Sequence, residues 1–327
     1  MADKKRRITS VDVAREAGLS RGTVSFVLNN TPGQSIPEAT RQRVLRAAAK
    51  LGYTPYAPAR TLRSGRSDVA LFVLPDWPQG PTMAALVDRA AQVLGQAGLT
   101  LITHVHAGHD DGLAQLWSAL SPAAVFGMRP FSAAELEGMR RVRIPAVLPP
   151  AEQPGYDVGS TLWINGVGRL QARYLIGKGH ERLAYVLPDD PRLVALGRGR
   201  AEGAMQACGE AGLPEPLVCK IGLDIESATM AVAGWQDAPT AVCAYNDEVA
   251  LAVLAGMRAL GVSLPVIGAD DIPAARFAVP SLTTVAQDSG EIGERIAKAL
   301  LRALNNADPE LGSMPSDVIR VVERDSA

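Results

Sequence analysis

The stretch VDVAREAGLSRGTVSFVLN, residues 11–29, decides how the first part of this chain folds. Two short helical patterns of apolar residues flank Gly18, and glycine readily adopts the positive φ that ends a helix. Small residues at Ala14 and Gly18 would let the two helices cross closely. Ser20 is a natural N-cap for the second helix. The stretch therefore predicts two short helices joined by a tight turn.

A third helix is expected from about Pro37 to Gly52, because its apolar residues keep the helical spacing. Thr9 or Ser10 would cap the first helix, and Leu19 would point inward. The predicted core positions are Val11, Ala14 and Ala17 in the first helix, Val24, Val27 and Leu28 in the second, and Val44, Leu45 and Ala48 in the third. Three short helices with a glycine-containing turn make a helix-turn-helix domain.

Charge is distributed unevenly along a chain whose formal net charge is -1. Residues 1–66 hold 13 Lys and Arg against 4 Asp and Glu, a net charge of +9, so the remainder of the 327 residues carries −10. A basic head on an acidic body suggests that the head meets a polyanion. The apolar periodicity of the head argues against the alternative, a disordered basic tail.

The N-terminal part of the second helix is the expected DNA reader, because a helix-turn-helix sends that part into the major groove. The guanidinium of Arg21 can grip guanine O6 and N7 together. Gly22 admits close approach of the backbone, and Phe26 can press on a thymine methyl. The short donors suited to phosphates are Ser20, Thr23, Ser25 and Asn29. The pattern leaves open one alternative, a plain three-helix bundle with solvated arginines.

From Asp68 onward, apolar strand-like runs alternate with helical patterns in two successive series. The expected strands are 69–75, 99–106, 123–128, 144–149, 182–188, 217–221, 240–245 and 266–270, with a last one in SDVIRVVERDSA, 316–327. Buried strands that alternate with helices are typical of doubly wound parallel sheets, so the body is predicted to be two α/β lobes. Ligands of such sheets bind beyond the carboxyl ends of the strands, which places a site in the cleft between the lobes.

The head resembles the DNA-binding head of the LacI/GalR family of bacterial transcription regulators. The resemblance rests on residues 11–29 together with TRQRVLRAAAKLGYTP, 40–55, and ARTLRSGRS, 59–67. Where the family often has a capping serine, this chain has Pro37, which suits a first helical turn. The resulting domain prediction is a helix-turn-helix domain at 1–54, a hinge at 55–66, and an effector-binding and dimerisation body at 67–327.

The resemblance also implies roles for individual head residues. Arg21, Gly22 and Phe26 stand where the family sets operator choice. The segment PYAPARTLR resembles the hinge that becomes a short helix on the operator, and it holds Arg60 and Leu62, which are grouped with the DNA contacts. In the family, this leucine enters the minor groove as a pair from two subunits. An apolar wedge of that kind unstacks a base step and kinks the duplex.

The body resembles, more loosely, the family's periplasmic-binding-protein-like effector domain. The matching segments are GKGHERLAYV, GRAEGAMQACGEAGL, AYNDEVALAVLAGMRALGV and PSLTTVAQDSGEIG. The resemblance implies that Arg200 and Asp270 bind the effector, and that Asn246 and Asp247 open a helix at the cleft. An arginine and an aspartate facing a cleft can hold the hydroxyls of a polyol through charge-assisted hydrogen bonds.

Three departures from the family pattern concern the cleft. The family's Asn-Pro-aromatic stretch is PDWPQGPTM here, in which Trp77 can offer a stacking face or pack beside the sheet. Its Asp-Asn pair is replaced by Trp163 and Ile164, and a few usual residues are missing between GVSLP and VIGADD. The scaffold is therefore expected to be kept, while the identity of the small molecule, a sugar or related metabolite, stays open.

The sequence supports a catalytic or metal-binding function less well than it supports DNA binding. The best metal-like cluster is His104, His106, His109, Asp110 and Asp111, and solvated strand-end histidines are the favoured interpretation because nothing downstream supplies a second shell. GRGRAEG, 197–203, has glycines faintly like a dinucleotide loop, but no strand stands directly before it. No P-loop motif occurs. We predict no enzyme activity, no metal and no cofactor.

The compartment follows from cysteine usage and from the absence of export signals. Cys208, Cys219 and Cys243 are odd in number and irregularly spaced, which favours reduced thiols in a cytoplasmic protein. No secretory h-region follows the N-terminal charges, and no run of about 18 apolar residues could cross a membrane.

The sequence thus predicts a repressor that binds a palindromic operator as a homodimer, with its affinity set by a small molecule. A dimer is expected because no heptad extension follows the last strand. One alternative is a solute-binding or sensory module for a sugar-like ligand, against which the basic head and the missing export signal argue. Another is an activator with the same DNA binding, because the sign of regulation depends on where the operator lies relative to the promoter.

Overall fold

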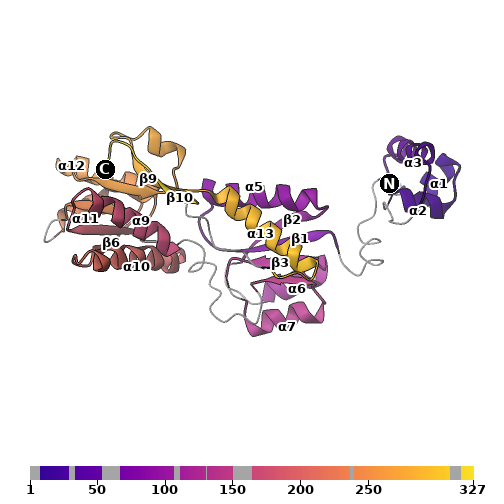
Figure 1. Cartoon of the computed structure of the whole chain (residues 1–327), viewed down its shortest axis with the longest axis horizontal. Helices are drawn as coiled ribbons and strands as arrows, with labels where there is room; N and C mark the ends of the chain where they lie inside the picture. Colours follow the sequence, from indigo (N-terminus) through magenta and orange to yellow (C-terminus); the bar gives the residue numbers. More distant parts are fainter. Residues whose placement is uncertain are drawn as a thin grey trace, which may run out of the picture. The chain divides into compact units, whose positions relative to one another are not determined.

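The structure, a computed structural model, describes residues 8–28, 34–53, 67–106, 111–129, 131–149, 164–235, 239–309 and 318–327. The chain divides into two compact units, Met1–Ser67 and Asp68–Ala327, and each is described here by itself (Figure 1). None of the helices in the described ranges has the length and apolar character that crossing a membrane requires.

The first unit contains three helices, as the sequence predicts: α1 (Ser10–Ala17), α2 (Arg21–Leu28) and α3 (Glu38–Leu51). The backbone N–H and the hydroxyl of Thr9, the N-cap of α1, donate to the Asp12 carboxylate at 2.8 and 2.6 Å. Gly18 ends α1 with a φ of 61°. Ser20 caps α2, because its Oγ accepts from the Thr23 backbone N–H at 3.1 Å. The predicted helix-turn-helix is confirmed.

Two of the predicted head core positions are wrong. Val11 is 42% exposed and Leu45 is 44% exposed, whereas Val13 and Ala47, each two residues further on, are buried. Two residues correspond to about 200° around a helix, so a side chain two positions before a buried one faces away from it. The observed core of the head consists of Val13, Ala14, Ala17, Val24, Val27, Val44, Ala47 and Ala48.

The first lobe of the body is a parallel sheet of order β2-β1-β3-β4 with helices on both faces (Figure 1). Its elements are β1 (Val69–Pro75), α5 (Pro81–Gln96), β2 (Thr100–His106), α6 (Asp111–Leu120), β3 (Ala124–Gly127), α7 (Ala133–Arg141) and β4 (Ala146–Leu148), joined by α13 (Ser289–Leu304). Alternate residues of β1 point to opposite faces. Phe72 packs with α5 and α13, whereas Leu71 and Val73 pack with α6 and α7.

The second lobe is a sheet of order β10-β9-β8-β7-β5-β6. Its elements are α9 (Ile164–Gly177), β5 (Leu183–Pro188), the short η1 (Pro191–Leu193), α10 (Val194–Glu210), β6 (Leu217–Ile221), α11 (Ile225–Ala233), β7 (Ala241–Ala244), α12 (Asp247–Leu260), β8 (Val266–Ala269), η2 (Pro273–Arg276), β9 (Thr283–Gln287) and β10 (Ile319–Val322). The edge strand β10 runs antiparallel to β9, so the expectation of a purely parallel sheet is wrong there. The reason is that β10 brings the chain back from the far end of α13.

The helix α13 joins the two lobes through a close contact with α5. It follows β9 of the second lobe in sequence but packs into the core of the first (Figure 1). A Cβ on Gly293 would lie 2.1 Å from the Leu86 carbonyl oxygen, so only glycine permits this approach. Arg89 Nε donates to Glu294 at 2.8 Å beside it. This crossing brings the residues between β9 and α13 to the space between the lobes.

Candidate DNA-reading helix and interlobe pocket

The exposed face of α2 begins with the residues that the sequence analysis selects for base contacts. Val24 and Val27 are buried in the head core and fix the helix. Arg21 and Gly22 are exposed at its N-terminus, and Phe26 is half-buried. A helix anchored on one face and led by an exposed arginine on the other has the form needed to enter a major groove.

The short polar side chains predicted to contact DNA differ in their exposure and in whether they already have a hydrogen-bond partner. The hydroxyls of Ser20 and Thr23 lie 2.9 Å apart, and Ser20 Oγ also caps α2, so Ser20 has a structural task. Ser25 is half-buried. The predicted contacts Asn29, Arg60 and Leu62 lie outside the described residues, as does the whole predicted hinge, 55–66.

Part of the basic charge of the head is neutralised internally. Lys50 Nζ lies 2.6 Å from Glu16, and Arg15 lies 3.6 Å from Asp12. Within the described head, no ion pair engages Arg21 or Arg43. These two cations are available to a polyanion.

A cavity of about 440 Å³ lies between the two lobes. It is lined where strands end: Trp77 follows β1, Met128 follows β3, Asp189 and Asp190 follow β5, Gly222 and Leu223 follow β6, Tyr245 and Asn246 follow β7, and Asp270 follows β8. Parallel sheets bind ligands at these ends. The predicted cleft site is therefore present as a cavity.

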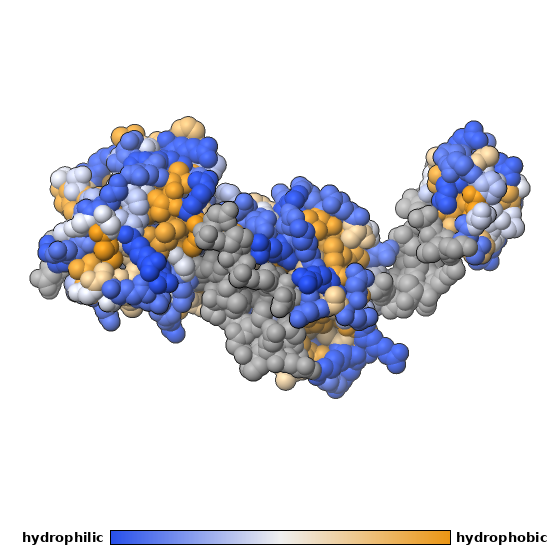
Figure 2. All heavy atoms as spheres, viewed as in Figure 1, coloured by the Kyte–Doolittle hydropathy of each residue, from blue (hydrophilic) through white to orange (hydrophobic). Residues whose placement is uncertain are grey.

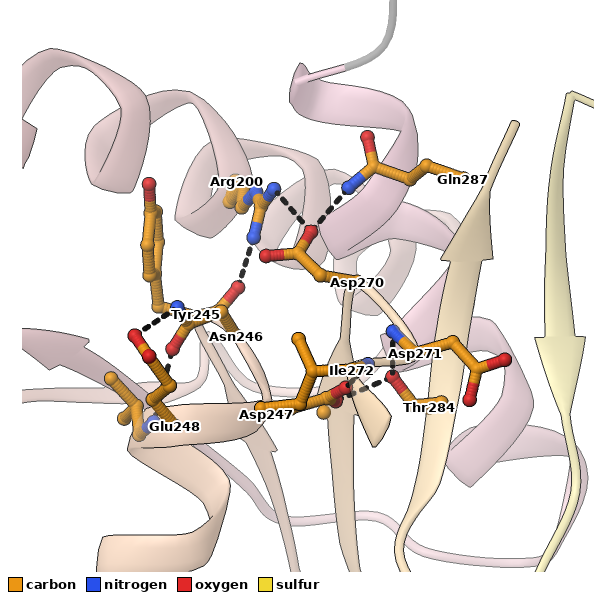
Figure 3. Close-up of polar contacts among 12 residues, drawn as sticks. Arg200, Tyr245, Asn246, Asp247, Glu248, Asp270, Asp271, Ile272, Thr284 and Gln287 are labelled. Atoms are coloured by element: carbon orange, nitrogen blue, oxygen red, sulfur yellow. Dashed lines mark hydrogen bonds and ion pairs between the residues drawn. The ribbon is translucent and has the colours of Figure 1, made fainter. Parts of the chain in front are cut away.

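Arg200 and Asp270 meet at one wall of this cavity (Figure 3). Arg200 Nη2 lies 3.3 Å from Asp270 Oδ1, and Nη1 donates to the Tyr245 carbonyl oxygen. Gln287 Nε2 donates to the same Asp270 oxygen at 2.5 Å. The guanidinium also lies over the Tyr245 ring, 4.5 Å from its centroid. Burial opposes the charge on Arg200, but the Asp270 carboxylate together with Tyr245 and Tyr185 outweighs it, so the pKa of the guanidinium is raised.

Arg200 reaches the cavity because α9 and α10 pack with their backbones in near contact. A Cβ on Gly168 of α9 would lie 1.7 Å from the Arg200 carbonyl oxygen. A Cβ on Gly203 of α10 would lie 1.9 Å from the Asn165 carbonyl oxygen. Of the glycines of GRGRAEG, Gly203 therefore serves the contact between α9 and α10, and a Cβ on Gly197 would lie 3.2 Å from Leu187 Cδ2, so neither needs a dinucleotide to explain it.

The backbone at Asp270 is held in an uncommon conformation. Its φ is 99° and that of Asp271 is 48°, in the region that glycine favours. The backbone N–H of Asp270 donates to the Val285 carbonyl oxygen at 2.9 Å, which ties this turn to β9. Such conformations persist where the surrounding structure enforces them, and they gather at binding sites.

Asn246 and Asp247 are predicted together as cleft residues, but only Asn246 lines the cavity. Asn246 lines the cavity and caps α12 by accepting from the Val249 backbone N–H at 3.0 Å. Asp247 is fully buried behind the wall, where it accepts from Thr284 Oγ1 at 2.5 Å and from the Ile272 backbone N–H at 2.8 Å (Figure 3). Burial raises the pKa of Asp247 to about 7. Asp247 therefore holds the loop that carries Asp270 and does not face the cavity.

The remaining wall includes residues that the sequence analysis missed. Trp77 lines the cavity and also packs against the core of the first lobe, so both of its expected positions are realised. Tyr245, Gln287, Ser289, Asp189 and Glu248 line the cavity as well. Each lies at or just beyond the end of a strand, and that position is the signal that could have found them.

Three buried polar atoms on cavity-lining residues have no hydrogen-bond partner among the described residues: Arg200 Nε, Gln287 Oε1 and Ser289 Oγ. An unpaired buried polar group costs about 1–3 kcal/mol. Each of the three atoms has almost no surface open to the cavity, so their unpaired state costs the fold free energy and does not by itself define a ligand.

The histidine cluster does not assemble a metal site in the part of the chain that the structure describes. His106 is buried, with 9% of its surface exposed, and His104 is half-buried, so the expectation of solvated histidines is wrong for His106. His109 and Asp110 lie outside the described residues. Among the described residues, no three His, Cys, Asp or Glu side chains are grouped as metal ligands would be.

Comparison with known proteins agrees with both units. Residues 9–56 match the family of bacterial regulatory proteins called the lacI family, and residues 172–327 match a periplasmic binding protein-like domain. The transcriptional regulator DegA of Bacillus subtilis is 30% identical, over 96% of this chain and 97% of DegA. The chain belongs to the LacI family. This LacI-family chain is also 30% identical to the transcriptional regulator CelR of Thermobifida fusca, over 94% of this chain and 95% of CelR.

Solved structures show the same fold for this LacI-family chain. The Lac repressor dimer bound to operator and the anti-inducer ONPF matches with a TM-score of 0.76 and 20% identity, covering 98% of this chain and 99% of that one. A CelR–cellobiose complex matches with a TM-score of 0.62 and 24% identity, covering 98% and 100%. The predicted family and fold class are confirmed, and the chain is a DNA-binding transcriptional regulator of the LacI type.

Proposed function

We propose that this regulator is a repressor that binds a palindromic operator as a homodimer, and that a small molecule in the interlobe cavity sets its affinity. The observation that carries the proposal is the anchoring of α2, which buries Val24 and Val27 and leaves Arg21 and Gly22 exposed. In the proposal Arg21 reads a guanine, and Thr23, Ser25 and Asn29 contact phosphates. Phe26 contacts a thymine methyl.

Residues 55–66 act in this proposal as the hinge between the DNA-binding domain, 1–54, and the body, 67–327. Leu62 from each subunit enters the minor groove as an apolar wedge, and Arg60 contacts the backbone beside it. Two copies of α2 held at a fixed separation then match the two half-sites of an inverted repeat.

Exposed apolar side chains on the second lobe support the dimer. Phe277 is 82% exposed and Val279 is 72% exposed. Val279 and Val262 line one groove on this lobe. Figure 2 shows hydrophobic residues interrupting the hydrophilic surface of both lobes. Burial of such side chains against a second copy is the expected source of association free energy.

The effector is proposed to bind Arg200, Asp270, Asn246 and Trp77, which line a cavity with walls from both lobes. A ligand that contacts both walls favours one arrangement of the lobes, and operator affinity changes by the difference in its affinity for the two arrangements. Asp247 acts through the loop that it holds. The regulator needs no catalytic group for this task, and we place its action in the cytoplasm, where operators are accessible.

Selection of bound sequences from random duplex DNA by the purified full-length protein tests the proposal. The expected result is an inverted repeat, bound by two subunits per duplex in a mass measurement. Recovery of no inverted repeat, with the protein folded, would contradict it. The competing function, a solute-binding or sensory module, predicts no preference for any duplex over a scrambled competitor.

A further inference from the structure

The interlobe cavity has almost no free positive charge to offer a ligand. Arg200 is the single Lys or Arg among the described residues that line it. Its Nη1 and Nη2 are engaged by the Tyr245 carbonyl oxygen and by Asp270. Phosphate and carboxylate ligands are held by forked pairs of donors from arginine or by lysine. Among the described lining residues, only neutral donors remain for such a ligand, because Arg200 Nε is buried.

Two helix N-termini of the cavity wall, those of α12 and α13, are also occupied, although a helix N-terminus attracts anions. At α12, Asn246 accepts from the Val249 N–H at 3.0 Å, and Glu248 stands in the first turn. At α13, Asp288 accepts from the Glu291 N–H at 2.9 Å. The chain's own oxygens therefore occupy the positive ends of α12 and α13, whereas α5, which begins at Pro81 in the first-lobe wall, has no side-chain cap.

Two carboxylates at the cavity have no counterion among the described residues. Asp189 and Glu248 both line it and both are exposed. They follow β5 and β7, which are adjacent strands of the sheet. Among the described residues, Glu248 accepts one hydrogen bond, from Asn246 Nδ2 at 3.4 Å (Figure 3). The neighbouring Asp190 differs, because Arg192 Nη2 lies 2.6 Å from it.

The opposite wall, from the first lobe, is largely apolar. Met83, Leu86 and Met128 line it together with Trp77, and Gln79 and Thr82 are its only polar side chains among the described residues. A ligand that fits both walls has an apolar face and a polar, positively charged one. The apolar face packs on the first lobe, while the polar face meets polar side chains of the second lobe, including Asn246 and Gln287.

We propose that the effector of this regulator is a small organic amine, protonated at neutral pH, whose ammonium group lies between Asp189 and Glu248. This inference rests on the proposed effector role of the cavity and specifies its ligand class. Ammonium groups gain from carboxylates and from the face of an aromatic ring such as that of Tyr245. Phosphorylated sugars, nucleotides and organic acids are expected to be rejected by the same carboxylates.

Matched probes that differ only in charge test the inference. Tyramine, tyrosol and 4-hydroxyphenylacetate form one set, and glucosamine, glucose and glucuronate form another. Titration calorimetry on the full-length protein should find the amine of at least one set bound about tenfold more tightly than its neutral and acidic counterparts. Glu248→Gln and Asp189→Asn should abolish this preference. Glu226→Gln, an exposed first-turn glutamate of α11 away from the cavity, should leave it unchanged.

Equal or tighter binding of a neutral or acidic member in both sets overturns the inference, as does failure of both amines to bind at about 10 mM. Preference for an amine that survives both cavity substitutions overturns it too. Operator binding is measured on the same samples without a probe. A protein that binds its operator but shows no amine preference refutes the ligand class alone, whereas a protein that binds no operator refutes the proposed function.

Discussion

Asp270 and Asp247 show, at the scale of single residues, how burial separates two acids that follow neighbouring strands. Asp270 faces the cavity and holds Arg200 and Gln287. Asp247 is fully buried and bonds Thr284 and the Ile272 backbone instead. A sequence pattern marks both as acids at strand ends. Their different tasks depend on which way each side chain points, and only the packed structure determines that.

Asp247 makes stability depend on pH. Burial raises its pKa from 3.8 to about 7, so the folded protein holds the proton more tightly than the unfolded chain does. Its stabilising contribution is therefore complete below about pH 4 and is lost as pH rises toward 7. Asp247→Asn removes this titration, so the loss of unfolding free energy between low and high pH should be smaller by about 1–4 kcal/mol in the variant. Urea unfolding of the unsubstituted protein and of the variant at pH 5 and pH 8 measures this difference. Equal losses of unfolding free energy in the two proteins would refute the prediction.

Arg21 is the residue on which base reading depends most. Arg21→Ala should weaken operator binding by about 1–3 kcal/mol and relax the preference at one base position, because a bidentate guanine contact is lost. Arg43→Ala is the matched control, since Arg43 is exposed on α3 and no ion pair engages it among the described head residues. It should weaken operator and random DNA alike. A similar loss for Arg21→Ala on both duplexes would remove its base-reading role.

At the scale of elements, close helix contacts place the polar residues of the cavity. The α9–α10 contact depends on Gly168 and Gly203, and the α5–α13 contact depends on Gly293. Each glycine faces a carbonyl oxygen of the neighbouring helix at a distance that excludes a Cβ. The first contact positions Arg200, and the second positions the turn that carries Gln287 and Ser289.

Gly168→Ala should destabilise the body by about 1–3 kcal/mol, because its Cβ would overlap the Arg200 carbonyl oxygen and force α10 away. Gly177→Ala is the matched control in the same helix, since a Cβ there meets no atom within 4 Å. It should be neutral or stabilise by up to about 1 kcal/mol. Urea denaturation gives both values. If the two variants had equal free energies of unfolding, the prediction would be wrong, because α9 and α10 could then move apart without loss of stability.

The positions of helices and strands are largely predictable from the sequence. Which face of a helix is buried, and in which direction a strand pairs, are less predictable. Apolar runs such as 69–75 and 266–270 become β1 and β8, and Gly18 and Gly52 end α1 and α3. The direction of β10 is not predictable from its own residues, because it depends on where α13 packs. The errors at Val11 and Leu45 have a similar cause, since a helix has several apolar stripes and its neighbours decide which is buried.

At the scale of the whole molecule, the separation of charge between head and body determines which part of the chain attracts DNA. The head carries +9 and the rest −10, so a polyanion is attracted to one end of the chain and repelled by the remainder. Cavity residues were harder to predict than this division. Arg200, Asp270, Asn246 and Trp77 were identified by resemblance, whereas Tyr245, Gln287 and Ser289 enter the site only through the fold.

Operator binding should therefore weaken steeply with salt. Each phosphate contact releases about one condensed counterion, so a head that makes several contacts should lose roughly two or more orders of magnitude in affinity between about 50 and 200 mM salt. Fluorescence anisotropy of a labelled operator duplex measures the slope, with a scrambled duplex as control. The scrambled duplex should bind more weakly with a similar slope, because phosphates carry most of the salt dependence. Operator affinity that hardly changes over this range would mean that the basic head does not meet the DNA backbone.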